Sequence, residues 1–387
     1  MNYPDSKSVV VAFPSQSRGG CEEYALNIAK ALHNLGYKVH TMFPPAEGTA
    51  TLRASFSEFE ASFNPLILRY WQPGRFRRIR LAWDILRIAL LILRKRPKAV
   101  HISLPWPNTA TELLLACALL GVRTVVVFQL VGEEFHLSAS MVRKYLWAKA
   151  RNPKWVAVSE NNRKILCDVF TLPTSEIHLI PNGVALAPSN EFAQAEIAEL
   201  VDRKSVILTV ARLSFQKGID LLLRAFAAVA PDFPNHQLFL IGDGELIEEL
   251  RSLAAELAIS DRVLFLGRRS DVHDWLRVAD LFVLPSRSEG LSFALLEAMA
   301  AGVPILASNA SSIPDLIKDG QGGVLFEKEN VESLNKKLFW VLSNPKNMRE
   351  MATNSWRKAQ GFSQENMIEK TLQLLSVESI QEAAPRL

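Results

Sequence analysis

Residues 286–302 read Ser-Arg-Ser-Glu-Gly-Leu-Ser-Phe-Ala-Leu-Leu-Glu-Ala-Met-Ala-Ala-Gly, and they follow the strand-like run Leu281–Leu284. Glu289 lies in the loop directly after that strand, and Glu297 lies about one turn inside the helix that the apolar residues predict. The first N–H groups of such a helix attract phosphate. A carboxylate in an otherwise apolar helix is costly unless it is hydrogen-bonded. The stretch therefore predicts a strand–loop–helix site for a ligand that carries phosphate.

Strands and helices alternate in the same way through the whole sequence, which is the pattern of a parallel sheet covered on both faces. The alternation starts twice, with Lys7-Ser8-Val9-Val10 and again with Lys204-Ser205-Val206-Ile207. We therefore expect an α/β protein with two Rossmann-like, doubly wound domains, which suits a length of 387 residues. Because Pro181-Asn182-Gly183 is a turn signal, we place the domains at residues 1–185 and 186–361. The expected strands are 9–13, 39–43, 99–103, 124–128, 155–158, 206–210, 238–241, 263–266, 281–284 and 304–307.

Composition narrows the class of protein. Charged residues make up 22% of the sequence, and no apolar run approaches the ~20 residues that span a bilayer. The N-terminal residues lack the basic start, apolar centre and cleavage site of a signal peptide. Three widely spaced cysteines predict neither a disulfide framework nor a zinc site. A reducing cytoplasm is the simplest compartment.

The net charge of +4 conceals a basic segment between Arg69 and Lys98, in which ten basic residues face one acid, Asp84. Aromatic and aliphatic side chains alternate with the arginines. Such a face would attract anionic lipid headgroups and make the protein peripheral at the inner face of a membrane. The alternative is a domain helix with a solvated basic face, whose apolar residues serve packing. Nucleic-acid binding is not expected, because no recognised binding motif accompanies the charge.

Four further motifs, taken with residues 286–302, resemble a known family. They are Gly19-Gly20, Ile180-Pro181-Asn182-Gly183-Val184, Val210-Ala211-Arg212-Leu213-Ser214-Phe215-Gln216-Lys217-Gly218 and Ile241-Gly242-Asp243-Gly244-Glu245. In this order they are similar to the motifs of family 4 glycosyltransferases of the GT-B fold, and the resemblance covers nearly the whole chain. It implies two Rossmann-like domains that face one another across a cleft. It also implies a C-terminal helix at about 362–380 that packs back on the first domain.

The resemblance further implies a retaining glycosyltransferase that takes its sugar from a UDP- or GDP-sugar. Arg212 and Lys217 would contact the pyrophosphate, Glu289 would bind sugar hydroxyls, and Glu297 would hold the ribose. The other donor-binding positions implied are Gly19, Gly20, Arg268, Gly290, Leu291 and Ser292. Asp-x-Asp, the usual metal-binding pattern of other glycosyltransferases, is absent from the sequence. The two cations would therefore do the work of a metal ion, and no cofactor is expected.

The acceptor, a glycan or a lipid-linked sugar, would be bound by the first domain. Many relatives have a histidine just after the strand that corresponds to 124–128, and this chain has Gln129 there. Glutamine cannot take a proton at neutral pH, so the base would be Glu133 or Glu134, or the leaving phosphate oxygen would accept the proton. His101 is expected at a strand end and not as a catalyst. Two other function classes stay open, a nucleotide-sugar epimerase of the same architecture and a non-catalytic nucleotide-sugar-binding protein.

Overall fold

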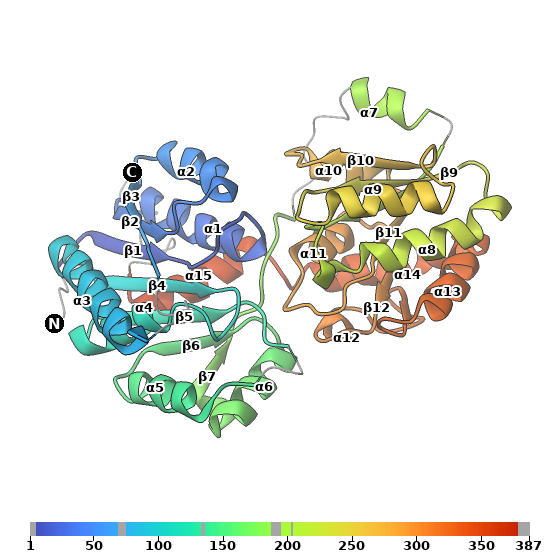
Figure 1. The fold of residues 1–387 in the computed structure, drawn as a ribbon. Coiled ribbons are helices and arrows are strands. Elements are labelled where there is room, and N and C mark those ends of the chain that lie inside the picture. The colour runs from blue at the N-terminus through green and yellow to red at the C-terminus, as the bar shows by residue number, and fades with distance from the viewer. Residues whose placement is uncertain (1–4, 69–74, 133–135, 187–194, 203, 378–387) are drawn as a thin grey trace. The chain divides into compact units, whose positions relative to one another are not determined.

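The computed structural model describes residues 5–68, 75–132, 136–186, 195–202 and 204–377 (Figure 1). The chain forms two compact units, each with its own parallel sheet. Unit 1 contains residues 1–182 and 365–387, and unit 2 contains residues 183–364. The division falls after Asn182, where the sequence analysis placed it after residue 185.

The strands of unit 1 are β1 (Ser8–Ala12), β2 (Lys38–Phe43), β3 (Ser62–Pro65), β4 (Ala99–Leu104), β5 (Arg123–Phe128), β6 (Lys154–Ala157) and β7 (Ile177–Leu179). They are parallel and lie in the order β3-β2-β1-β4-β5-β6-β7. Its helices are α1 (Gly20–Asn34), α2 (Ala50–Ser57), α3 (Arg77–Lys95), α4 (Thr111–Leu120), α5 (Ala139–Lys149), α6 (Glu160–Phe170) and α15 (Gln364–Leu375).

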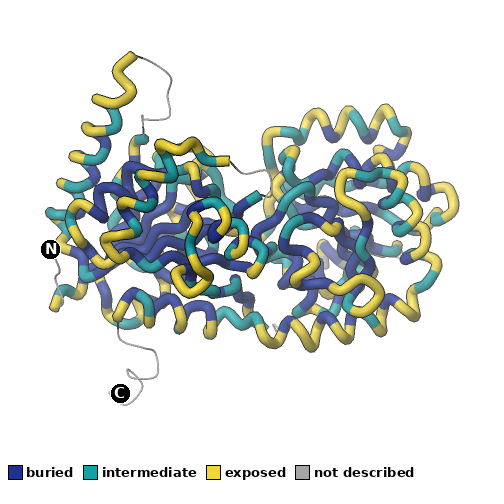
Figure 2. The backbone as a smooth tube through the Cα atoms, turned by 90° about the horizontal axis from the view of Figure 1, so that it is seen from below, coloured by how far each residue is buried: buried dark blue, intermediate teal, exposed yellow. Residues whose placement is uncertain are grey.

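Valine-rich strands build the core of unit 1, because β-branched side chains pack well on both faces of a covered parallel sheet. Val10 and Ala12 lie in one apolar cluster with α3, α4 and α5. The opposite face packs against α1, where the ring of Tyr24 stacks on that of His101 in β4. Figure 2 shows the strands as buried and the outer turns of the helices as exposed.

The strands of unit 2 are β8 (Ser205–Val210), β9 (His236–Ile241), β10 (Val263–Gly267), β11 (Leu281–Leu284), β12 (Ile305–Ser308) and β13 (Val324–Phe326). They are parallel in the order β10-β9-β8-β11-β12-β13. Its helices are α7 (Ala195–Leu200), α8 (Ile219–Val229), α9 (Ile247–Glu256), α10 (Val272–Val278), α11 (Phe293–Ala300), α12 (Ile313–Leu316), α13 (Val331–Ser343) and α14 (Pro345–Ala359). Helices α8, α9 and α13 share one apolar cluster with the sheet. On the other face Trp275 of α10 packs on Phe239 of β9.

Both sheets have the doubly wound order in which the second and third strands lie on one side of the first strand and the fourth lies on its other side. The predicted α/β class with two doubly wound sheets is therefore confirmed. The sequence analysis did not anticipate β3, β7 and β13, which have only three or four residues and lack a long apolar run. None of the described helices is long and apolar enough to cross a membrane.

The chain leaves unit 2 beside the point where it entered. Val184 N–H donates to Phe362 O at 2.9 Å, and Gln364 N–H donates to Val184 O at 3.0 Å. Helix α15 then returns to unit 1, where the hydroxyls of Tyr24 and Thr371 are 2.7 Å apart. The expected C-terminal helix at about 362–380 is thus observed at Gln364–Leu375, and residues 378–387 lie outside the described residues.

Candidate functional site

In unit 2 the loops after β8 and β11 meet at the point where the strand order reverses. These strands are neighbours, although β8 is followed along the chain by β9 on its other side. In open α/β sheets, ligands bind outside the carboxyl ends of the strands at such a switch point. The loop after β8 carries Arg212 and Lys217, and the loop after β11 carries Glu289.

Lys217 and Glu289 form an ion pair between these two loops. Lys217 Nζ lies 2.7 Å from Glu289 Oε1, and the two side chains are 20% and 6% exposed. Glu289 Oε1 also accepts a 2.6 Å hydrogen bond from Ser286 Oγ. Within the described residues, Glu289 Oε2 accepts no hydrogen bond and the Lys217 ammonium donates no other one. One carboxylate oxygen and two ammonium protons are therefore available to a ligand.

Serines at the ends of β11 and β12 hold the Glu289 loop. Ser286 is fully buried, and its carbonyl accepts a 2.6 Å hydrogen bond from Ser308 Oγ, the last residue of β12. The loop from β8 is fastened to the same segment, because Gln216 Nε2 donates to Ser288 O at 2.8 Å and Arg287 N–H donates to Gln216 O at 2.8 Å. The sequence analysis did not identify these residues. The only signal was the polar run directly after the apolar strand.

Arg287 joins the loop after β11 to helix α8 and to the loop after β8. Its guanidinium makes two hydrogen bonds of 2.7 and 2.8 Å with the carboxylate of Asp220 in α8, and it lies 4.0 Å from the ring centroid of Phe215. Gly218 closes the loop at φ +64°, and a Cβ there would lie 2.1 Å from Pro285 O. Only glycine allows the two loops to approach this closely.

Arg212 differs from Lys217 in having no side-chain partner within the described residues. It is exposed on the loop after β8, where the neighbouring Leu213 N–H donates to Asp243 O at 2.9 Å in the loop after β9. The backbone of the arginine is thus held while its guanidinium faces solvent. Arg268, also exposed, follows the edge strand β10, with β9 between it and β8.

Helix α11 begins beside the ion pair. Ser292 is its N-cap, and Ser292 Oγ accepts from Leu295 N–H at 3.3 Å. The N–H groups of the first turn have no partner inside the helix and carry partial positive charge. Gly290 and Leu291 are buried just ahead of the cap, and Glu297 is half-buried in α11. The structure therefore gathers Lys217, Glu289 and the start of α11 at one place.

The remaining predicted positions lie in unit 1. Gly19, with φ −168° and ψ −163°, is the N-cap of α1, and Gly20 begins the helix directly after the loop from β1. Gln129 follows β5 and is buried, and its Oε1 accepts a 3.2 Å hydrogen bond from Asn182 Nδ2. Glu133 and Glu134 lie outside the described residues.

His101 was expected at a strand end, and this prediction is wrong. It is the third residue of β4, fully buried against Tyr24, because the strand begins two residues before it and continues to Leu104. Burial lowers its pKa from 6.5 to about 3, so the ring is neutral at physiological pH. Within the described residues neither ring nitrogen has a hydrogen-bond partner.

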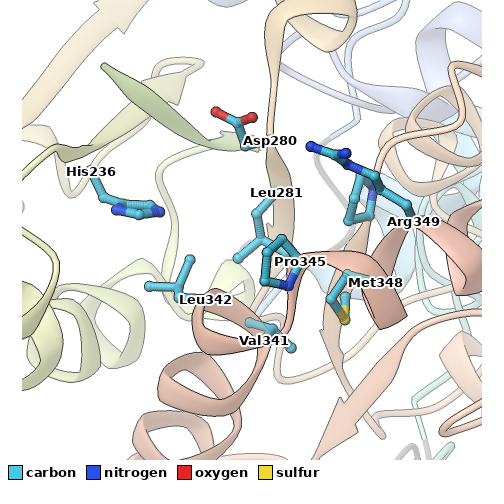
Figure 3. Close-up of a pocket in the computed structure, with 9 residues that line it drawn as sticks. His236, Asp280, Leu281, Val341, Leu342, Pro345, Met348 and Arg349 are labelled. Atoms are coloured by element: carbon cyan, nitrogen blue, oxygen red, sulfur yellow. The ribbon is translucent and has the colours of Figure 1, made fainter. Parts of the chain in front are cut away.

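A small pocket lies at the opposite edge of the unit 2 sheet, where the strands begin. His236, Asp280 and Arg349 line it together with apolar residues of α13 and the start of α14 (Figure 3). Its volume of about 60 Å³ would hold a few water molecules, whereas ligand pockets measure about 300–1,000 Å³. Among the described residues, no group of three or more His, Cys, Asp and Glu side chains is placed to hold a metal ion.

Two sequence families match the chain. Residues 18–187 match the family described as Glycosyltransferase Family 4, and residues 191–358 match the family described as Glycosyl transferases group 1. The first match includes Gly19, Gly20 and Gln129, and the second includes every predicted site residue of unit 2.

The individual proteins that the chain resembles are also glycosyltransferases. An uncharacterized glycosyltransferase of Haemophilus influenzae is 33% identical over 228 residues, which are 59% of this chain and 62% of the relative, so the match spans less than two thirds of that protein. UDP-Gal:alpha-D-GlcNAc-diphosphoundecaprenol alpha-1,3-galactosyltransferase of Escherichia coli is 28% identical over 78% of this chain and 81% of its own length. Anabaena HepE in complex with UDP superposes with a TM-score of 0.77 at 18% identity, over 95% of this chain and 99% of that one. The likeness shows the fold, which is GT-B.

Proposed function

Because the chain belongs to the group 1, family 4 glycosyltransferases, we propose that it transfers a sugar from a nucleoside diphosphate donor to a glycan or lipid-linked acceptor, with retention at the anomeric carbon. The observation that carries the proposal is the Lys217–Glu289 ion pair at the switch point of unit 2. It places a cation and a carboxylate with an available oxygen side by side, next to the start of α11.

The diphosphate binds beside Arg212, Lys217 and the first turn of α11. When the bond between the sugar and the diphosphate breaks, negative charge grows on the leaving phosphate, and fixed positive groups aimed at it lower the barrier. Glu289 already balances the charge of Lys217, so Arg212 supplies the uncompensated charge. The first-turn N–H groups of α11 add partial positive charge. These groups perform the electrostatic work without a metal ion.

Glu289 orients the sugar. One of its oxygens is held by Lys217 and Ser286, and the other accepts a hydrogen bond from a sugar hydroxyl. Glu297 binds the ribose hydroxyls, the segment around Arg268 binds the base, and Gly19 and Gly20 bring backbone toward the diphosphate. These three roles follow from the family resemblance. The name of the Escherichia coli relative, which contains UDP-Gal and a diphosphoundecaprenol acceptor, supports a UDP-sugar donor and a lipid-linked acceptor.

The acceptor proton goes to the leaving diphosphate. Gln129 cannot act as a base, because its amide is neutral and already accepts a hydrogen bond from Asn182. In the same-face displacement that retention requires, the acceptor oxygen bonds to the anomeric carbon on the face that the diphosphate leaves, and the departing phosphate oxygen takes the hydroxyl proton. The configuration at the anomeric carbon is retained.

The test is to incubate the full chain with a panel of UDP- and GDP-sugars, with and without lipid-linked and glycan acceptors, and to measure release of nucleoside diphosphate. We expect release that depends on one donor, persists in EDTA and yields a product with the anomeric configuration of the donor, measured by NMR. A rearranged sugar nucleotide formed without acceptor would instead identify an epimerase. Saturable donor binding without release for any acceptor would identify a binding protein. Loss of activity in EDTA that Mg²⁺ restores would overturn metal independence.

A further inference from the structure

Helix α3 has two apolar faces, and within the part of the chain that the structure describes, one of them packs on the core of unit 1 and the other is exposed. Ile88 and Ile92 are buried in the core cluster, and Ile85 packs partly against it. This inner face lies against α4, and Figure 1 shows α3 on the outside of unit 1. These inner residues are the ones through which α3 packs on the core of unit 1.

The outer face carries a second apolar row, which within the described residues is not among the side chains that pack on the core cluster of unit 1. It consists of Ile79, Trp83, Leu86 and Leu90, at spacings of four, three and four residues, with exposed fractions between 46% and 67%. Such spacing places the four side chains in one stripe along the helix. Phe76, the N-cap, is also exposed. Within the described residues, these five are among the twelve large hydrophobic side chains that are exposed, so they form a patch and not the usual scatter.

Positive charge surrounds this outer row. Residues 75–98 contain nine basic side chains and one acidic one. The acid, Asp84, is buried, with Arg87 3.8 Å from it, so it does not offset the charge at the surface. Arg75, Arg78 and Arg94 are exposed. Within the described residues their side chains form no ion pair.

We propose that the outer face of α3 docks on an anionic phospholipid bilayer, with the helix lying in the plane of the interface. An apolar stripe with tryptophan and leucine between arginines is the composition of interfacial helices. The apolar row inserts at the boundary between the headgroups and the acyl chains, and the arginines bind the anionic headgroups. The one-sided charge of this face, nine basic side chains against one buried acid, favours a uniformly anionic surface such as phospholipid headgroups over a protein partner. The inference is independent of the identity of donor and acceptor.

The first experiment measures co-sedimentation of the full chain with phosphatidylcholine vesicles that contain or lack phosphatidylglycerol. We expect binding to the anionic vesicles that weakens as salt rises. Trp83→Ser/Leu86→Ser should weaken this binding about tenfold or more, since two apolar side chains no longer enter the interface. The matched control is Trp340→Ser/Trp356→Ser, which removes two exposed tryptophans from α13 and α14 in unit 2. All four side chains are exposed, so both variants should melt as the wild type does.

Two further variants separate the apolar and the charged contributions. Arg75→Gln/Arg78→Gln should bind anionic vesicles more weakly and with less dependence on salt, whereas Arg143→Gln/Arg224→Gln, which changes two exposed arginines elsewhere, should bind normally. Trp83→Phe should still bind, yet lose the blue shift of tryptophan fluorescence that vesicles produce. Three results would overturn the proposal: unchanged binding of Trp83→Ser/Leu86→Ser, an equal loss in its control, or a chain that is dimeric through this face and becomes monomeric in that variant.

Discussion

Lys217 Nζ lies 2.7 Å from Glu289 Oε1 and joins loops that are 72 residues apart in sequence. The loops leave neighbouring strands, β8 and β11, so the ion pair spans the switch point of the sheet. Glu289 is buried and also bonded to Ser286, whereas Lys217 retains two donors. The pair therefore fixes the position of the carboxylate and leaves capacity to bind a ligand.

A double-mutant cycle measures what this pair contributes. Lys217→Met leaves the buried carboxylate without its cation, and Glu289→Gln leaves the ammonium without its anion, so each should lower the free energy of unfolding. The double variant should recover part of the loss, with a coupling of about 1–3 kcal/mol in urea unfolding. Each single variant should also lower turnover about 10²–10³-fold, because it removes a group that acts on the reacting sugar or diphosphate.

The matched cycle is Lys336→Met with Glu332→Gln in α13. That ion pair is equally short, at 2.6 Å, but its side chains are 73% and 76% exposed. It should show no measurable coupling, and all its variants should keep normal turnover. If the Lys217–Glu289 cycle is no larger than this one, the pair has no structural role. Normal turnover of Glu289→Gln would contradict its proposed role with the sugar.

Arg212 should affect donor binding and leave stability unchanged. Its guanidinium is exposed and has no partner within the described residues, so its replacement removes no contact of the folded chain. Arg212→Gln should lower kcat/KM for the donor about 10–100-fold, the effect of one lost hydrogen bond to a charged group. Arg224→Gln, which changes an exposed arginine of α8, should leave both quantities unchanged. A lower melting temperature for Arg212→Gln would show that the arginine supports the fold instead.

Gly242 should be the glycine that tolerates substitution least well among those near the site. Its φ is +136°, and a Cβ there would lie 1.8 Å from Ala211 O, next to Arg212. Gly242→Ala should therefore lower the free energy of unfolding by about 3 kcal/mol or more and weaken donor binding, since the loop after β8 must shift. Gly320→Ala tests backbone strain alone, because Gly320 has φ +72° and open space around it, and it should cost about 1 kcal/mol. Equal losses in chemical unfolding would show that the close approach to Ala211 is unimportant.

Local sequence patterns predicted much of the fold and the sheet edge at which the candidate site residues of unit 2 lie. Runs such as Val9–Val11 and Val125–Val127 predict buried parallel strands, and the polar residues after β8 and β11 point to the carboxyl edge of the sheet. The hydrogen bond from Ser308 to the Ser286 carbonyl could not be predicted, because it depends on the register between β11 and β12.

For helix α3, the sequence could not predict which apolar residues are buried. Its apolar residues occur on two faces, and sequence periodicity does not tell which row the sheet and α4 will cover. Ile88 is fully buried, whereas Trp83 is exposed, and only the tertiary structure distinguishes them. The expectation that His101 lies at a strand end had another origin, because the predicted strand 99–103 already had it in the middle and β4 extends that range by one residue only.

His101 should make the protein less stable in mild acid. Its folded pKa of about 3 lies below the ordinary 6.5, so between these values the unfolded chain binds a proton that the folded chain does not. Stability therefore falls as the pH drops below 6.5, by about 2 kcal/mol at pH 5. His101→Phe keeps a ring that can stack on Tyr24 and removes both unpaired nitrogens, so it should abolish this part of the dependence. Urea unfolding at pH 8 and pH 5 measures the difference, with His273→Phe, an exposed histidine of α10, as the control that keeps the wild-type slope. A buried neutral histidine must bind its proton when the chain unfolds in mild acid. If the free energy of unfolding of His101→Phe depends on pH as that of the wild type does, other groups cause the acid sensitivity.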